Sequence, residues 1–447
     1  MKKRILLSLI TMALLLPAGT GKISSQPKDL TFPDSSVVDE WFNDISVKEP
    51  GELGKIYKIS DFGAVSDAQR MQTALIQSVI DKAAEEGGGV VVIPEGIFKS
   101  GALFFKQGTH LYMSRGAVLL GSESIMDFPI VNTRIEGEIC RYFPALINAD
   151  GLDGFTLTGP GIIDGNGAPY WAAFWMRRQW NPECTNKDEQ RPRLVHISNC
   201  KNVVIANVTL ENSPFWTCHV YKTDHAKLIN VRIFSPLFPS PSASADGIDL
   251  DVCSNILVKG CRITVNDDAV CFKGGKGPWA DTDPANGPDF NILIEDVFFD
   301  NTTGSCVTCG SECIRTHNIL IRNCIVENGR SFLQLKMRPD TPQYYEYIVV
   351  DGIKGSCSNV INVAPWTQFF DLRDRKDIPH SYGKHIILRN IDLECKKFAI
   401  LVKNDEQYTL DDFTFKNLKI RAQDAKWNRE AVRDLKVFNT SINGVRQ

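Results

Sequence analysis

The chain lacks a strong excess of charge of either sign. Its 447 residues carry 50 Lys and Arg against 53 Asp and Glu, which gives a formal net charge of −3. This balance argues against a nucleic-acid-binding protein, which needs an excess of cations. Charged residues make up 23% of the chain and hydrophobic residues 43%, so extended disorder and fibrous sequence are excluded as well. We expect a packed core, with any charged partner bound by a local cluster of side chains.

Long apolar runs are also missing after the N-terminus. Residues 2–4 are basic, residues 5–17 form a short apolar run, and small residues follow at 18–21, a pattern typical of a secretory signal peptide. We expect residues 1–22 to be this peptide, no segment to span a membrane, and the mature protein to be exported to the periplasm or the outside of a bacterium. Disulfides are permitted in that environment.

The thirteen cysteines do not form the framework of a small disulfide-rich protein. All lie between Cys140 and Cys395, and their number is odd, so at least one is unpaired within the chain. Cys306, Cys309 and Cys313 have a spacing that suggests metal, but no His or Cys completes a recognised four-ligand pattern. We interpret the cysteines as small buried hydrophobic residues or local disulfide partners and expect no metal.

The clearest helix is predicted over residues 67–89. Met71, Leu75, Val79 and Ala83 recur at helical spacing, Ser66-Asp67 is a plausible cap, and three glycines at 87–89 end the pattern. Short strands with turns between them follow, beginning at 90–93 and 111–113.

A phrase then recurs along the rest of the chain, in which Asn or a short polar residue precedes several aliphatic residues. Successive copies from Ile205 onward are 23 to 38 residues apart, too irregular for a β-propeller and too poorly alternating for stacked sandwich domains. Each copy has room for two or three short strands and none for a regular helix. This predicts a solenoid of parallel strands. The copies are centred on Leu157, Ile205, Leu228, Val258, Ile294, Ile321, Val350, Leu388 and Phe415.

The predicted fold class is therefore all-β, a single-stranded right-handed parallel β-helix with an N-terminal capping helix. Residues 23–55 form a lead segment, residues 56–435 the β-helix catalytic domain, and residues 436–447 a C-terminal tail. We expect a monomer.

A solenoid brings residues of matching phase on successive coils about 4.8 Å apart. By this criterion Asp246, Asp268, Ser305 and Lys336 share one flank, and Asp246 and Asp267, one short coil apart, are expected to face each other. Asp267 and Asp268 both reach a ligand only if the chain bends at Asn266 to Asp268. Closely placed carboxylates suit glycoside hydrolysis, although a solvated turn or a calcium site has the same composition.

At these residues the chain resembles glycoside hydrolase family 28, the polygalacturonase and rhamnogalacturonan hydrolase family. The resemblance spans roughly residues 56–420, and its motifs occur in the family's order. They are Asp61-Phe62-Gly63-Ala64-Val65, Gly159 to Gly167, Arg191 to Leu194, Asn212 to Trp216, Ser244 to Asp249, and Asn266 to Lys273.

The resemblance implies an inverting hydrolase of galacturonate-containing pectin that needs no cofactor. Asp267 is then the general acid, and Asp246 and Asp268 position and deprotonate the attacking water. Two positions depart from the family pattern. Ser305 stands where a histidine is expected, and Gln334 replaces the arginine of an Arg-Ile-Lys segment while Lys336 is kept.

The departures change the expected substrate. Glutamine cannot make the bidentate contact of arginine to a carboxylate, so one sugar site is expected to bind a neutral residue, as in a rhamnogalacturonan or another branched pectin. Lys336, Lys273 and Arg338 are candidates for holding a uronate, although the last two are equally well explained as solvated charges. The insertion Gly274 to Gly287 is expected to close one end of the cleft and favour exo-action, but such a loop can also be inconsequential.

Two other functions remain open from the sequence. A polysaccharide lyase needs a base beside the uronate and usually calcium, and would release unsaturated products. A noncatalytic β-helix would bind a pectic glycan without cleaving it. The expected partner in each case is a pectic oligo- or polysaccharide that contains galacturonate, and not nucleic acid.

Overall fold

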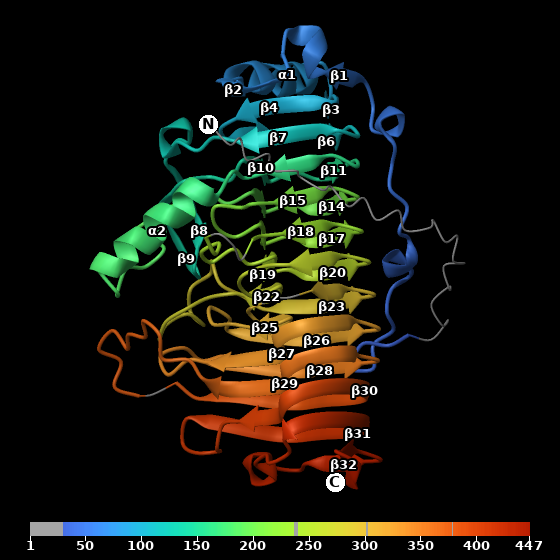
Figure 1. Ribbon diagram of the computed structural model, residues 1–447, viewed down its shortest axis with the longest axis vertical. Helices are drawn as coiled ribbons and strands as arrows, with labels where there is room; N and C mark the ends of the chain where they lie inside the picture. Colours follow the sequence, from blue (N-terminus) through green and yellow to red (C-terminus); the bar gives the residue numbers. More distant parts are fainter. Residues whose placement is uncertain (1–29, 237–239, 301–302, 378) are drawn as a thin grey trace, which may run out of the picture.

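The computed structural model describes residues 30–236, 240–300, 303–377 and 379–447. Its strands wind into a column of coils, in which each strand pairs in parallel with its equivalent in the next coil (Figure 1). The protein is a right-handed parallel β-helix, as predicted. The strands form three stacks along the column.

The first stack contains the recurring aliphatic phrases of the sequence. Its members are β1 (Ile56–Lys58), β3 (Gly89–Ile93), β6 (Thr109–Met113), β11 (Thr156–Thr158), β14 (Lys201–Ala206), β17 (Asp224–Ile229), β20 (Ser254–Lys259), β23 (Asp289–Glu295), β26 (Arg315–Arg322), β28 (Gln343–Asp351), β30 (Ser381–Leu401), β31 (Tyr408–Asp424) and β32 (Lys436–Phe438).

The second stack follows one turn later in each coil. It contains β2 (Asp67–Met71), β4 (Gly96–Ser100), β7 (Ala117–Gly121), β12 (Ile162–Asp164), β15 (Thr209–Glu211), β18 (Arg232–Phe234), β21 (Arg262–Thr264), β24 (Phe298–Asp300), β27 (Ile325–Met337) and β29 (Lys354–Pro365). The long strands β30 and β31 continue it to β33 (Ser441–Ile442), which pairs antiparallel with β34 (Val445–Arg446).

The third stack carries the candidate active site. It consists of β5 (Leu103–Phe105), β10 (Ile147–Asp150), β13 (Val195–Ser198), β16 (Cys218–Tyr221), β19 (Ile248–Asp251), β22 (Val270–Lys273) and β25 (Val307–Cys309), and then the second halves of β27 and β29.

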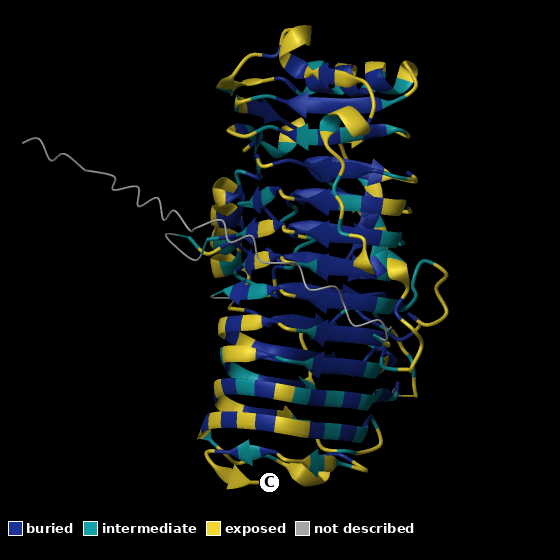
Figure 2. Ribbon diagram, turned by 90° about the vertical axis from the view of Figure 1, so that its right-hand side faces the viewer, coloured by how far each residue is buried: buried dark blue, intermediate teal, exposed yellow. Residues whose placement is uncertain are grey.

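The repeat centres predicted from the sequence are register partners in the structure. Leu157 pairs with Ile205, Ile205 with Leu228, Leu228 with Val258, and the series continues one coil at a time to Phe415. All of these residues are buried in one continuous core, which Figure 2 shows as dark blue bands across successive coils. Each coil alone leaves its apolar interior open, so stacking is what buries it.

The asparagine that opens many of these phrases has a structural role. Asn255, Asn291 and Asn318 adopt positive φ of 54° to 56°, a conformation that asparagine tolerates better than most residues. Their side chains form a ladder, because Asn318 donates to Asn291 at 3.2 Å and Asn291 donates to Asn255 at 3.2 Å. Each asparagine therefore both turns the chain and joins one coil to the next.

The cysteines are packing residues. All thirteen are free thiols, twelve are buried and Cys140 is partly buried. Cys306, Cys309 and Cys313 lie in the apolar core with no exposed surface. The prediction of small buried hydrophobic residues is confirmed, and the alternative of local disulfides is wrong.

The predicted capping helix is present but shorter than expected. Helix α1 (Thr73–Glu85) closes the N-terminal end of the column and buries Ile76, Val79 and Ile80 (Figure 1). Residues 67–71 form strand β2 instead, because Gln72 binds the backbone N–H and C=O of Val65 and turns the chain before the helix begins.

The C-terminal end of the column is closed by β32 to β34, so part of the predicted C-terminal tail belongs to the stack.

The lead segment runs along the outside of the first stack. Its short 3₁₀ helices are η1 (Glu40–Asn43) and η2 (Pro50–Glu52), and η3 (Ile59–Phe62) follows β1. Phe32, Val38 and Phe42 cover outward-facing leucines such as Leu257 and Leu293. The predicted signal peptide lies among residues 1–29, outside the described part of the chain.

Two excursions leave the coils beside the third stack. The first is the hairpin of β8 (Val131–Ile135) and β9 (Glu138–Tyr142), which follows the 3₁₀ helix η4 (Ile125–Asp127). A further 3₁₀ helix, η5 (Arg429–Ala431), lies near the C-terminus and belongs to neither excursion. The second contains helix α2 (Ala168–Trp180), which contradicts the expectation that no coil has room for a helix. It fits because α2 and the loop after it leave the coil between β12 and β13. In the described residues, neither helix is long and apolar enough to cross a membrane.

Candidate active site

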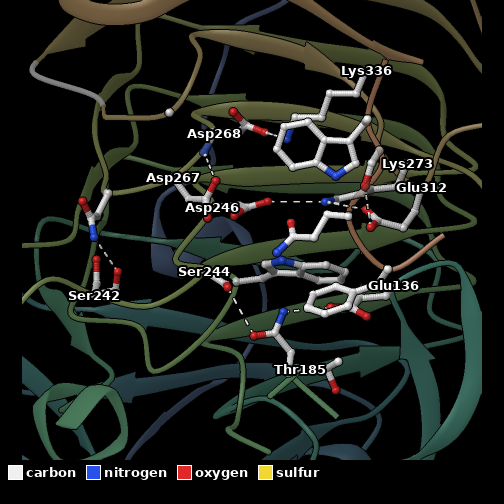
Figure 3. A pocket seen from close by; sticks show the side chains of 18 of the residues that line it. Glu136, Thr185, Ser242, Ser244, Asp246, Asp267, Asp268, Lys273, Glu312 and Lys336 are labelled. Carbon is white, nitrogen blue, oxygen red and sulfur yellow. Dashed lines mark hydrogen bonds and ion pairs between the residues drawn. The ribbon is translucent and has the colours of Figure 1, made fainter. Parts of the chain in front are cut away.

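A cleft of about 350 Å³ lies over the third stack, and all three predicted aspartates line it (Figure 3). Asp246 precedes β19, and Asp267 and Asp268 precede β22. One side of the cleft is bordered by Phe174, Trp175 and Arg178 of α2. The opposite side includes Trp366, Gln368 and Phe369.

Strand register fixes which groups lie in adjacent coils. Ile248 pairs with Val270, and Val270 pairs with Val307, so Asp246, Asp268 and Ser305 occupy the same position two residues earlier. The register partner of Asp246 in the next coil is thus Asp268. Asp267, one residue earlier, is near enough to Asp246 for the Asp246 charge to raise its pKa. The expected bend is present at Asn266 and Asp267, and it turns both neighbouring carboxylates into the cleft.

Asp268 is held as a carboxylate by two donors. Lys336 Nζ lies 2.6 Å from Asp268 Oδ2, and the backbone N–H of Ser305 donates to Oδ1 at 2.9 Å. Burial alone would raise the pKa of Asp268, but the Lys336 ammonium group and these hydrogen bonds lower it below its ordinary value. Asp268 is therefore suited to accept a proton.

Asp267 has the opposite character. Burial raises its pKa to about 8, and the charges of Asp246 and Asp268 act in the same direction. The Asp268 N–H donates to Asp267 Oδ1 at 3.0 Å, which fixes the side chain at the bend. Asp267 thus holds a proton near neutral pH and is suited to donate it.

A second cation, Lys273, is surrounded by three carboxylates. Its Nζ lies 3.4 Å from Asp246, 3.4 Å from Asp249 and 3.3 Å from Glu312. Burial raises the pKa of Asp246 well above its ordinary value and that of Asp249 to about 7. Burial acts in the same direction at Glu312, but the charges of Lys273 and Lys276 and a hydrogen bond from Ser311 together outweigh it and lower the pKa of Glu312. Sequence reasoning missed Glu312, which lies 39 residues from Lys273 in a turn with no strand-like pattern.

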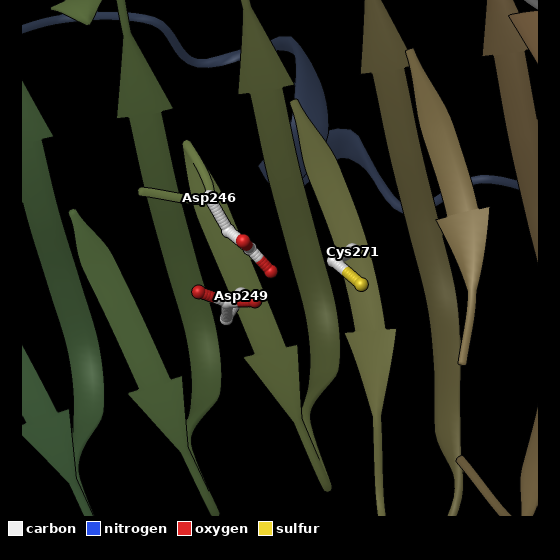
Figure 4. Close-up of side chains that lie close together, drawn as sticks. All are labelled: Asp246, Asp249 and Cys271. Atoms are coloured by element: carbon white, nitrogen blue, oxygen red, sulfur yellow. The ribbon is translucent and has the colours of Figure 1, made fainter. Parts of the chain in front are cut away.

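Asp246, Asp249 and Cys271 each bring one potential metal-ligand atom within 4.8 Å of the others (Figure 4). Lys273 already supplies a positive charge to both aspartates. A metal ion there would face the repulsion of this ammonium group, so we assign no metal to these residues.

The two departures from the family pattern contact each other. Ser305 Oγ donates a short hydrogen bond to Gln334 Oε1, and both side chains are buried beside Lys336. A neutral pair therefore occupies the positions where the resemblance leads one to expect a histidine and an arginine.

Arg338, the remaining cation predicted to hold a uronate, is instead paired with a carboxylate of the protein. Arg338 makes a bidentate pair with Asp340 at 2.8 Å and donates to the carbonyl oxygens of Gln368 and Phe369. It lies at the cleft, where it holds the loop that carries Phe369.

Arg330 is an exposed cation in the cleft that sequence reasoning missed. It lies three residues before Leu333, in register with Gly304 and Asp267 on the two preceding coils. Comparison of matching positions on successive coils would have identified it from the sequence. Gly304 permits this close stacking, because a Cβ there would lie 2.3 Å from the carbonyl carbon of Asp267.

The insertion 274–287 forms part of a wall. Lys276 lies 3.9 Å from Glu136 of the β8–β9 turn, and Arg373 pairs with Glu138 of β9. Arg375 lies 4.9 Å over the ring of Trp279 and donates to the carbonyl oxygen of Pro278. Three segments far apart in sequence are thereby joined at one side of the cleft.

Comparison with known proteins agrees with the geometry. Residues 130–337, which contain the three aspartates and Lys336, match the family model described as glycosyl hydrolases family 28. Over these residues the chain is similar to this family. A probable polygalacturonase of Vitis vinifera is 27% identical over 304 residues, covering 66% of this chain and 59% of that protein. An endo-polygalacturonase of Pectobacterium carotovorum subsp. carotovorum is 24% identical over 371 residues, covering 79% and 85%.

The first curated relatives are longer than the part that this chain matches. The matches span 59%, 54% and 52% of their lengths. Among solved structures, an exopolygalacturonase from Thermotoga maritima superposes with a TM-score of 0.71 at 21% identity, covering 88% of this chain and 93% of that one. This likeness supports the fold.

Proposed function

We propose that the protein hydrolyses α-galacturonosyl linkages in pectic polysaccharide with inversion of configuration. The observation that carries the proposal is the pair of adjacent carboxyl groups with opposite proton preferences, Asp267 with a pKa of about 8 and Asp268 with a lowered pKa. Acid and base catalysis of glycoside hydrolysis needs such a division.

In this mechanism Asp267 donates its proton to the glycosidic oxygen as the bond to the anomeric carbon breaks. Asp268 and Asp246 orient a water molecule on the opposite face of the sugar and remove its proton as it attacks. Lys336 keeps Asp268 ionised until that step. The water hydroxyl replaces the leaving sugar from the opposite side, so the product has the inverted anomeric configuration.

An exposed cation in the cleft supports an anionic sugar as part of the substrate. Arg330 lines the cleft, is exposed and stands in phase with the proposed acid. Lys276 also lines the cleft but lies 3.9 Å from Glu136. Lys273 and Arg338 are already paired with carboxylates of the chain. We therefore assign the uronate contact first to Arg330, with Lys336 at the border between substrate and Asp268.

The neutral pair Ser305–Gln334 supports a substrate in which a neutral sugar adjoins the galacturonate. Neither side chain lines the cleft, and the pair supplies no charge for a second uronate at this part of the site. We assign the protein to a branched or rhamnogalacturonan-type pectin on this basis.

Exo-action is the mode that we propose, since the joined segments 131–142, 274–287 and 366–375 form a wall beside the catalytic residues. Curated relatives include both an exo-poly-α-D-galacturonosidase and an endo-polygalacturonase. Export is proposed from the N-terminal pattern, and a polymeric substrate outside the cell fits it.

A panel of defined pectic oligosaccharides tests the activity. We expect release of a reducing galacturonate from one end, faster for oligosaccharides with a neutral neighbour, and loss of release in Asp267→Asn. Ultraviolet-absorbing unsaturated ends would establish a lyase instead. Retention of an oligosaccharide on the immobilised protein without any product would establish a binding protein.

A further inference from the structure

Asp249 is a fully buried aspartate beside the proposed catalytic groups. It lies on β19 with no exposed surface, and within the described residues neither of its carboxylate oxygens meets a donor with hydrogen-bond geometry. Its nearest cation, Lys273 Nζ at 3.4 Å, is shared with Asp246 and Glu312. An ionised carboxylate in such a place would lack the donors that replace water.

Asp251, two residues along the same strand, provides an internal contrast. It is equally buried, but Arg134 binds it through Nε at 3.0 Å and Nη2 at 3.2 Å, and His219 Nε2 lies 3.3 Å away. Burial alone would raise the pKa of Asp251, yet these partners lower it. The two aspartates differ in their partners and not in their burial, so only Asp251 is equipped to carry a charge.

Asp249 and Asp246 are neighbours, and a side-chain hydrogen bond between them contributes to the pKa of Asp249. One oxygen of each lies within 4.8 Å of the other (Figure 4), and like charges at this range in a buried site disfavour double ionisation. Asp246 lines the cleft, whereas Asp249 lies beneath it. The negative charge of the pair is better solvated at Asp246, and the proton is better placed at Asp249.

We propose that Asp249 carries a proton and donates it in a hydrogen bond to Asp246, as a positioning residue that keeps Asp246 ionised and oriented toward the attacking water. This inference rests on the proposed hydrolase function. No proton leaves Asp249 during the reaction. Asp246 receives the hydrogen bond in its ionised form, and the proton from the attacking water goes to the carboxylates that face the cleft.

The surroundings of Asp249 agree with a neutral group at this position. The positive charge of Lys273 faces the carboxylate of Glu312, whose pKa is lowered, and the carboxylate of Asp246. A third negative charge, on Asp249, is not needed to pair with Lys273. The pKa of Asp249 is raised to about 7 and that of Asp246 well above its ordinary value, so the pair holds a proton near neutral pH. The contact of Asp246 with the cleft and the complete burial of Asp249 are what assign this proton to Asp249. The titratable and charged groups that face Asp249 are Arg193, Cys218, His219, Asp246, Cys271, Lys273 and Glu312.

Comparison of Asp249→Asn with Asp249→Ala tests the inference. Asparagine reproduces a protonated aspartate, since its carbonyl oxygen can face Lys273 and its N–H₂ can donate to Asp246. We expect Asp249→Asn to keep most of the kcat at pH 5 and Asp249→Ala to lose about 10- to 100-fold, the value of one hydrogen bond to a charged group. Equal losses in both variants would overturn the proposal.

The pH profile is a readout that a purely structural role would not change. In the wild type, Asp249 loses its proton as the pH rises through about 7, so kcat should fall there, before Asp267 deprotonates near 8. In Asp249→Asn the alkaline limb of the kcat profile should move up by about one pH unit, because only the deprotonation of Asp267 then limits the reaction. An alkaline limb that stays at the wild-type position would contradict the proposal.

Thermal unfolding separates this inference from the proposed function. At pH 5, Asp249→Asn should unfold at the wild-type temperature, because one neutral donor replaces another, whereas Asp251→Asn should unfold several degrees lower, because it removes the carboxylate that pairs with Arg134. A lowered unfolding temperature for Asp249→Asn would overturn the protonated state of Asp249. Absence of wild-type activity on every pectic substrate would overturn the proposed function instead, and leave the unfolding test valid.

Discussion

Lys336 Nζ lies 2.6 Å from Asp268 Oδ2, and this ion pair joins residues two coils apart in the third stack. Asp267 and Asp268 are neighbours in sequence, yet only Asp268 contacts the ammonium group. A single lysine therefore divides the two carboxyl groups into a proton acceptor and a proton donor.

Replacing Lys336 should remove this division. In Lys336→Met the buried Asp268 loses its cation and its pKa rises, so we expect kcat near neutral pH to fall at least about 100-fold, within the range of general acid–base contributions. Breaking one side of a buried pair should also cost about 3–5 kcal/mol of unfolding free energy. Product release and chemical denaturation measure the two effects.

The matched control is Lys259→Met. Lys259 pairs with Glu295 away from the cleft, and Glu295 keeps a second partner in Arg322 at 3.1 Å. This variant should lose less stability than Lys336→Met and retain wild-type kcat. If the Lys336 variant kept wild-type kcat as well, Lys336 would have no part in the reaction.

Asp267→Asn should change the pH dependence of stability in a defined direction. The folded-state pKa of Asp267 is about 8, above the ordinary 3.8, so the native state binds more protons than the unfolded state between these values. The stabilising effect of this protonated group is present below pH 4 and is lost as the pH rises to 8. The variant should therefore lose activity but show a flatter stability curve over pH 4–8, measured by unfolding at a series of pH values. An unchanged curve would contradict the raised pKa.

Arg330→Ala tests the uronate contact. Removal of an exposed guanidinium that pairs with the substrate should raise KM for acidic oligosaccharides about 10-fold and leave KM for their methyl esters unchanged. Arg315→Ala is the control, because Arg315 is paired with Glu346 at 2.8 Å and does not line the cleft. An equal rise of KM for the esters would show that Arg330 has no electrostatic role in binding.

Shortening the insertion tests exo-action. Gly287 N–H donates to the Gly274 carbonyl oxygen at 3.0 Å and closes the base of the loop, so residues 276–285 can be replaced by a short Gly-Ser linker. The wall then loses the contacts of Lys276, Pro278 and Trp279. We expect longer internal products and a faster fall in polymer viscosity. A product pattern identical to the wild type would mean that the insertion does not set the cleavage mode.

Most of the coil architecture was predictable because it is local and repeated. Stacked aliphatic residues such as Ile205 and Leu228 are in register because each occupies the same position in its own coil. Helix α2 was missed because its buried residues are aromatic while Met176 and Trp180 are exposed, which blurs the helical pattern. The boundary of α1 was misplaced because a side chain, Gln72, ends the preceding strand.

The site was predictable only in part. Motif and phase arguments found the three aspartates and Lys336, all of which line the cleft. They did not find that Arg338 is bound by Asp340, or that Lys273 is shared among three carboxylates, because these contacts depend on turns whose lengths are irregular. The hairpin and the loop at 366–375 reach the cleft through tertiary packing, which no local pattern of the sequence reports.

The most direct test of the account is the anomeric configuration of the first product. Incubation with an α-linked galacturonate oligosaccharide and immediate proton NMR should show the β-anomer first, followed by slow mutarotation, because a water activated by Asp268 and Asp246 attacks opposite the bond that Asp267 protonates. Appearance of the α-anomer first, or of an unsaturated sugar, would contradict inversion by these three aspartates.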